Sequence, residues 1–156
     1  MIKTKEIDNI GLTLCDYQSD LFEKSVNYLS CSSIYFIKTF MNSKIAKRID
    51  NPAFLLESVD VTALLNDLNN QHKLNRGKEL YPTYVMKWIG YIYRFFSYTY
   101  NYSSKKVYEI VKPKELYALY EPYHSLDPKE AIERIIESKN INTNIDLIEL
   151  AKKYYL

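Results

Sequence analysis

Glycine and proline are scarce in this sequence, with three glycines and five prolines among 156 residues. Tight turns and β-hairpins depend on these two residue types, so their scarcity argues against a turn-rich β architecture. It favours helices joined by short polar loops. The length suits one domain and is sufficient to bury a hydrophobic core without disulfides or metals. The sequence therefore predicts a single all-α domain over residues 1–156.

Cysteine is also rare, since Cys15 and Cys31 are the only two. Both fall in segments with helical periodicity, and no signal peptide precedes them. A disulfide framework is therefore not expected, and a reducing cytoplasm is the predicted location. The longest apolar stretch is interrupted by Lys87 and Arg94, so the sequence predicts no membrane span.

The motifs that usually carry reaction chemistry are missing. The sequence has no glycine-rich phosphate loop, no Cys/His spacing of a metal site and no strand followed by a nucleophile elbow. The two histidines, His72 and His124, lie far apart in the chain. We therefore expect no catalytic residue, no cofactor and no metal. A small enzyme that pairs His124 with an acid or a thiol is the alternative.

The net charge of +2 decides little about the class of binding partner, and the charged residues are distributed only slightly unevenly along the chain. Residues 81–126 carry six Lys or Arg and three acids, a local charge of +3. This excess is far below the dense basic patch that is typical of non-specific nucleic-acid binding.

Aromatic residues are concentrated in the stretch Tyr81–Tyr102, where they account for ten of 22 residues. Apolar residues recur there at spacings of three and four, which predicts a helix that begins near Pro82 and ends near Asn101. Because aromatic side chains occur on all its sides, this helix should be central and covered by others. The sequence thus predicts a compact bundle of about six to eight helices around it.

The other predicted elements are amphipathic helices, and one polar stretch, Asn69–Lys78, has no period and is predicted to be a mobile loop. Capping residues and prolines mark the helix boundaries. The predicted helices cover residues 5–28, about 30–48, about 60–68, 103–112, 113–122, 127–136 and a peripheral C-terminal segment, 144–156.

The segment 97–112 resembles a bacterial helix-turn-helix. Ser97, Asn101, Val107 and Ile110 have the spacing of a small residue, a left-handed turn residue and two buried anchors. In such a motif the second helix would contact base edges and phosphates. The alternative is two core helices joined by a tight turn, which the tyrosines crowding the turn favour. The DNA-binding candidates are Ser104, Lys105, Lys106, Glu109 and Lys112.

Eleven of the 16 tyrosines fall between Tyr81 and Tyr123. Tyrosine is enriched in protein interfaces because it offers a large contact area with a polar end at low entropic cost. An A+T-rich coding bias, which also favours Asn, Ile and Lys, is the alternative explanation. The most plausible partner-binding surface consists of Tyr91, Arg94, Tyr98, Tyr120, Tyr123 and His124.

Three segments carry a resemblance to a known group of proteins: NIGLTLCDYQSDLF, SSIYFIKTFMNSKIAKRIDNPAF and the stretch from WIGYIYRFF to EAIERI. They resemble small bacterial antitoxin-like proteins encoded beside ADP-ribosyltransferase-like toxins, over residues 9–136. No catalytic or binding motif comes with this resemblance. It implies a folded antitoxin that binds its cognate toxin and blocks the active site, with repression of its own operon DNA as a further expectation.

The composition and the resemblance together predict a non-enzymatic interaction protein that neutralises a toxin by steric cover. A helix-turn-helix regulator and a small enzyme are the alternatives. The sequence leaves the identity of the partner and the oligomeric state open.

Overall fold

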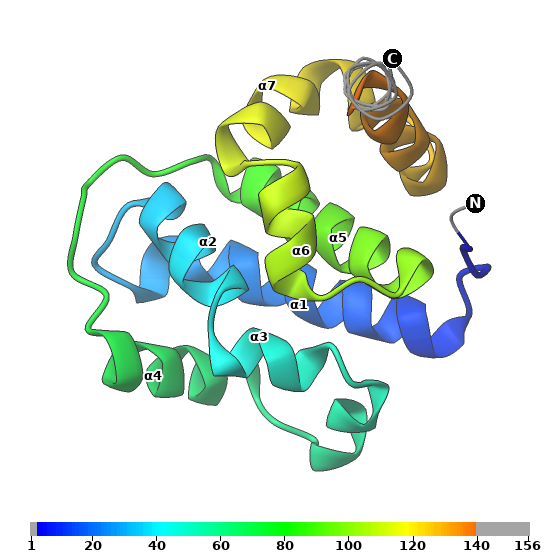
Figure 1. Cartoon of the computed structure of the whole chain (residues 1–156). Coiled ribbons are helices and arrows are strands. Elements are labelled where there is room, and N and C mark those ends of the chain that lie inside the picture. The colour runs from blue at the N-terminus through cyan, green and yellow to red at the C-terminus, as the bar shows by residue number, and fades with distance from the viewer. Residues whose placement is uncertain (1–2, 140–156) are drawn as a thin grey trace, which may run out of the picture.

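The computed structural model describes residues 3–139, which form nine helices and no strand. The all-α prediction is confirmed, although one expected helix is divided in two and one helix is of the 3-10 type. The predicted C-terminal helix over 144–156 lies outside the described residues. The helices are α1 (Asn9–Tyr28), α2 (Ser33–Met41), α3 (Lys44–Ile49), η1 (Pro52–Glu57), α4 (Val61–His72), α5 (Thr83–Tyr100), α6 (Ser104–Ile110), α7 (Pro113–Tyr123) and the helical residues 128–139 (Figure 1).

Helix α5 is the centre of the fold, as predicted. Twelve of its 18 residues are buried, and α1, α6 and α7 all pack against it (Figure 1). Its last turn closes at Asn101, which adopts the left-handed conformation with φ 54°. Asn tolerates this conformation better than most residues, and the helix therefore ends where the sequence predicts.

Helices α1 and α5 pack so closely that their backbones approach each other at Gly90. The side chain of Gln18 donates a hydrogen bond to the carbonyl of Gly90 at 3.0 Å, and Ser19 donates to the carbonyl of Lys87 at 2.9 Å. A Cβ atom added at Gly90 would lie 2.7 Å from the Gln18 carbonyl oxygen and 2.8 Å from the ring of Phe22. Glycine is therefore required here by the close approach of two helices.

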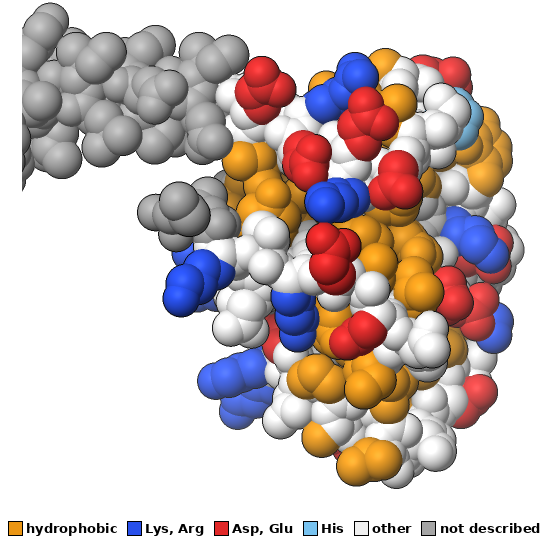
Figure 2. All heavy atoms as spheres, turned by 90° about the vertical axis from the view of Figure 1, so that its right-hand side faces the viewer, with side chains coloured by type: hydrophobic (Ala, Val, Ile, Leu, Met, Phe, Trp, Pro, Cys, Tyr) orange, Lys and Arg blue, Asp and Glu red, His pale blue; other side chains and the backbone are white. Residues whose placement is uncertain are grey.

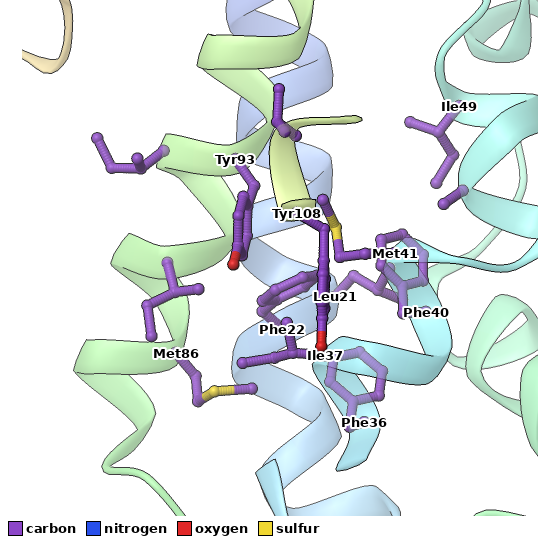
Figure 3. Close-up of a cluster of buried hydrophobic side chains, with 14 of the residues drawn as sticks. Leu21, Phe22, Phe36, Ile37, Phe40, Met41, Ile49, Met86, Tyr93 and Tyr108 are labelled. Carbon is purple, nitrogen blue, oxygen red and sulfur yellow. The ribbon is translucent and has the colours of Figure 1, made fainter. Parts of the chain in front are cut away.

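The hydrophobic core gathers side chains from all nine described helices, and Figure 3 shows the part between α1, α2, α3, α5 and α6. Phe22 of α1 meets Phe36 and Phe40 of α2 edge to face, with ring centroids 5.1 and 5.4 Å apart. Across the cluster, the hydroxyl of the buried Tyr93 donates to the carbonyl of Val111 at 2.7 Å. No helix within residues 3–139 is long and apolar enough to cross a membrane.

The helix boundaries differ from the prediction at three places. The first helix begins only after Asp8, whose carboxylate accepts from the N–H of Gly11. The helix expected over 30–48 is broken at Asn42, because Ser43 caps a new helix by accepting from Ala46 N–H. Residues 52–57, for which the sequence predicts no helix, form the 3-10 helix η1.

The prediction of a loop from Asn69 is wrong in its first part, because α4 continues to His72. The rest of the segment is tied to α2 by backbone hydrogen bonds. The N–H of Ser32 donates to the carbonyl of Arg76, and that of Ser33 to the carbonyl of Glu79. Leu74 is buried, so this connection is held to the rest of the fold at Leu74, Arg76 and Glu79.

Candidate protein-binding surface

Five aromatic side chains of α5, α7 and the residue that follows α7 make up a surface that we call the aromatic patch: Tyr84, Trp88, Tyr117, Tyr120 and His124. Tyr120 is at its centre. Its ring stacks on His124 with centroids 4.3 Å apart and planes 11° apart, and it contacts Tyr84 at 5.5 Å and Trp88 at 5.7 Å. Aromatic pairs at such distances hold each other in place beyond the effect of area burial alone.

The patch is open to solvent. Tyr84 and Tyr117 are 59% and 43% exposed, and His124 is also exposed. Beneath it, Tyr117 contacts the buried Tyr81 at 4.3 Å between centroids. Exposed aromatic surface that is supported by core side chains in this way often marks a binding site.

The local sequence explains why these rings share a face. Tyr84 and Trp88 are four residues apart on α5. Tyr117 and Tyr120 are three apart on α7, and His124 follows four residues later as its C-cap. Pro113 opens α7 in its first turn, and the fully buried Leu116 fixes this helix against the core. The Nδ1 atom of His124 lies 2.7 Å from the carbonyl oxygen of Tyr120, which holds the imidazole over the Tyr120 ring.

The predicted binding surface does not exist as one site. Arg94 is wrong as a contact residue because it is 1% exposed, and its guanidinium lies in the core against Asp50. Tyr98 is likewise buried, with its hydroxyl donating to Asp8 at 2.6 Å. Tyr120 and His124 belong to the aromatic patch, and Tyr123 is half-buried on the same helix.

Tyr91 lines a different hollow, a cleft of about 350 Å³ between the N-terminal residues 4–7, α5 and residues 127–133. Figure 2 looks onto this side of the molecule and shows hydrophobic side chains between acidic and basic ones. The salt bridge between Lys129 and Glu6, 3.7 Å apart, connects the N-terminal residues with residues 127–133 across the cleft. Burial, with the nearby Cys15, Asp16 and Asp127, raises the pKa of Tyr91 to about 12, so its phenol stays neutral.

The helix-turn-helix candidates are only partly accessible. Ser104 is wrong as a base-contacting residue, because it is 1% exposed and its hydroxyl donates to Asp50. Lys105, Lys106, Glu109 and Lys112 are exposed, and the Nζ atom of Lys106 lies 3.9 Å from the centre of the Tyr102 ring. Helix α6 has seven residues, which leaves little length for a recognition helix.

The thiols that an enzyme would need are in the core. Cys15 is fully buried, and burial raises the pKa of its thiol to about 12, so it is not a thiolate near neutral pH. Cys31 is also buried, and burial raises its pKa as well. Within residues 3–139, no group of His, Cys, Asp and Glu side chains is arranged to hold a metal ion.

Three members of the aromatic patch, Tyr84, Trp88 and Tyr117, were absent from the predicted site. The spacing within α5 could have indicated two of them. Tyr84 lies off the buried face of the helix, and it precedes Trp88 by four residues, which places the two rings close together. The juxtaposition of α5 with α7 was needed to connect them with Tyr120.

No protein-family model matches this chain, and neither a curated protein nor a solved structure matches it.

Proposed function

We propose that this chain is a non-enzymatic binding protein that neutralises a toxin by direct contact through the aromatic patch. The observation that carries the proposal is the cluster of partly exposed rings centred on Tyr120. Trp and Tyr are the residue types most enriched among the hot spots of protein interfaces. A patch that contains one Trp and three Tyr therefore suits a protein partner better than a small polar ligand.

The rings are held in place before any partner arrives, which favours tight binding. Tyr84 and Trp88 project from a helix whose opposite side is core, and Tyr120 is held between them and His124. Side chains that are already ordered lose little conformational entropy on association. The patch can therefore serve as a rigid surface on which a partner docks without a large rearrangement.

The partner class comes from the resemblance to antitoxins encoded beside ADP-ribosyltransferase-like toxins. The mechanism that fits is steric: the patch packs against the toxin and covers its active-site cleft, so that substrate is excluded. Such a role needs no catalytic group, and it agrees with the burial of both thiols.

The experiment expresses the tagged chain together with the products of its immediate gene neighbours and identifies the co-purified protein by mass. The proposal expects one stoichiometric partner whose expression alone stops growth, with growth restored when this chain is also present. Recovery of the chain alone, together with neighbours that are harmless when expressed singly, would remove the toxin-neutralising role.

A further inference from the structure

Positive charge is concentrated on three helices that lie on one side of the molecule. Together α2, α3 and α6 contain six Lys or Arg and one acid, Glu109, a charge of +5. The whole chain has a net charge of only +2, so the remaining residues sum to −3. Figure 1 shows α2, α3 and α6 next to one another on the near side of the fold. The sequence obscured this concentration because α6 follows α3 by more than 50 residues.

Asp50 brings two of these helices together. It ends α3, and its carboxylate accepts hydrogen bonds from the backbone N–H of Ser104 at 3.1 Å and from the Ser104 hydroxyl at 2.5 Å. As a result Lys47 of α3 and Lys105 of α6 line the same hollow of about 320 Å³. Lys47 also borders a neighbouring hollow of about 490 Å³ with Lys44 and Arg48.

The two acids that line these hollows, Asp50 and Glu57, already have partners, whereas three of the lysines do not. Asp50 pairs with the buried Arg94 at 2.7 Å, and Glu57 pairs with Arg48 at 2.8 Å. Lys44, Lys47 and Lys105 are exposed and have no ion-pair partner within residues 3–139. Their charges are therefore available to an anionic partner.

We propose that this basic face, defined by Lys44, Lys47 and Lys105, binds duplex DNA through the phosphate backbone. Lysines suit phosphate contacts as flexible point charges, and the linings also offer two exposed polar side chains, Asn51 and Ser103, that can donate to phosphate oxygens. This surface is separate from the aromatic patch. It also differs from a helix-turn-helix, because it uses α3 and does not require α6 to read bases.

The linings of the two hollows favour duplex DNA over the other polyanions. Single strands bind on exposed aromatic rings, yet the only ring in these linings, Phe54, is 2% exposed. Protein interfaces need an apolar or aromatic anchor at their centre, and Met41, the other large apolar side chain in the linings, is 1% exposed. The exposed groups in these linings are therefore charged side chains and hydrogen-bond donors. Such groups suit contacts to the phosphate backbone of DNA.

The test is fluorescence anisotropy with two unrelated labelled duplexes of about 30 base pairs, titrated between about 50 and 200 mM KCl. The proposal expects similar binding of both duplexes, with a dissociation constant of about 1–100 µM near physiological salt, and tighter binding at low salt. The variant Lys47→Ala/Lys105→Ala should bind at least about 10-fold more weakly. The negative slope of the logarithm of the association constant against the logarithm of the salt concentration should become shallower by about 2.

The matched control is Lys24→Ala/Lys87→Ala. These two exposed lysines lie on α1 and α5 and are paired with Asp20 and Glu23. The control removes the same charge and should leave the affinity within about twofold of the wild type, since the removed charges lie outside the basic face. Absence of duplex binding at low salt, equal weakening by both double variants, or equally tight binding of single-stranded DNA or polyglutamate would each overturn the proposal.

Discussion

The guanidinium of Arg94 lies 2.7 Å from the carboxylate of Asp50, in a site where Arg94 is 1% exposed. Its Nε atom donates to Gln18 at 2.9 Å, and its Nη2 atom donates to Ser104 at 2.9 Å. One side chain of α5 thus ties together α1, the end of α3 and the start of α6. Burial lowers the pKa of Arg94, and the adjacent Asp50 opposes this shift. The ion pair therefore helps to keep a cation in the core.

Removing one member of this pair should be costly. Arg94→Met leaves the Asp50 carboxylate without its counter-charge, so we expect the free energy of unfolding to fall by about 3–5 kcal/mol. Urea denaturation monitored by circular dichroism measures this loss. The matched control is Arg48→Met, because Arg48 forms an ion pair of similar length, 2.8 Å to Glu57, on the surface. That change should cost less than about 1 kcal/mol. Equal losses in the two variants would contradict the buried role of Arg94.

Gly90→Ala should destabilise the protein although alanine is the better helix former. Alanine normally gains about 1 kcal/mol over glycine inside a helix. Here its Cβ atom would clash with the Gln18 carbonyl and the Phe22 ring, both closer than 3.0 Å. Overpacking of this kind typically costs about 1–3 kcal/mol, so a net loss is expected in urea denaturation. A variant more stable than the wild type would show that α1 and α5 are not in such close contact.

Stability should decline in alkali because of the tyrosines. Burial raises the pKa of Tyr17, Tyr91 and Tyr98 to about 12 from an ordinary value of 10. The neutral phenol is thus favoured in the folded state. This contribution is complete below pH 10 and is lost as the pH rises from 10 to 12, since the unfolded chain releases these protons first.

Phenolate absorbance followed together with circular dichroism tests this expectation. Three tyrosines should ionise with a midpoint near pH 12, whereas ordinary tyrosines ionise near pH 10. The urea concentration at the midpoint of denaturation should fall as the pH rises from 10 to 12. Ionisation of all tyrosines near pH 10 with an unchanged midpoint would contradict the burial of these three phenols.

Much of the fold follows from local sequence signals, whereas the site depended on tertiary contacts. The period of three and four predicted α5, and Asn101 predicted its end, because both signals act within one helix. The same period cannot distinguish a buried Arg94 from an exposed one, since the partner Asp50 is 44 residues away in the sequence. The aromatic patch and the basic face likewise each combine helices that are distant in the chain.

The break between α2 and α3 shows a second limit of the sequence. Apolar residues continue with helical spacing through Asn42 and Ser43, and the periodicity alone predicts one helix. The cap formed by the Ser43 hydroxyl and the Ala46 N–H, 3.1 Å apart, divides it. A short polar pair can end one helix and start another without interrupting the hydrophobic pattern.

The central claim is that the aromatic patch binds the partner protein, and quantitative capture by patch variants tests it most directly. The tagged variant Trp88→Ala/Tyr120→Ala is expressed with the gene neighbours beside the wild type and the control Tyr28→Ala. Tyr28 is 44% exposed on α1 and lies outside the patch. We expect the patch variant to bind the partner at least about 10-fold more weakly, as for the loss of interface hot spots, and the control to bind as the wild type does. A folded patch variant that captures as much partner as the wild type would contradict the claim.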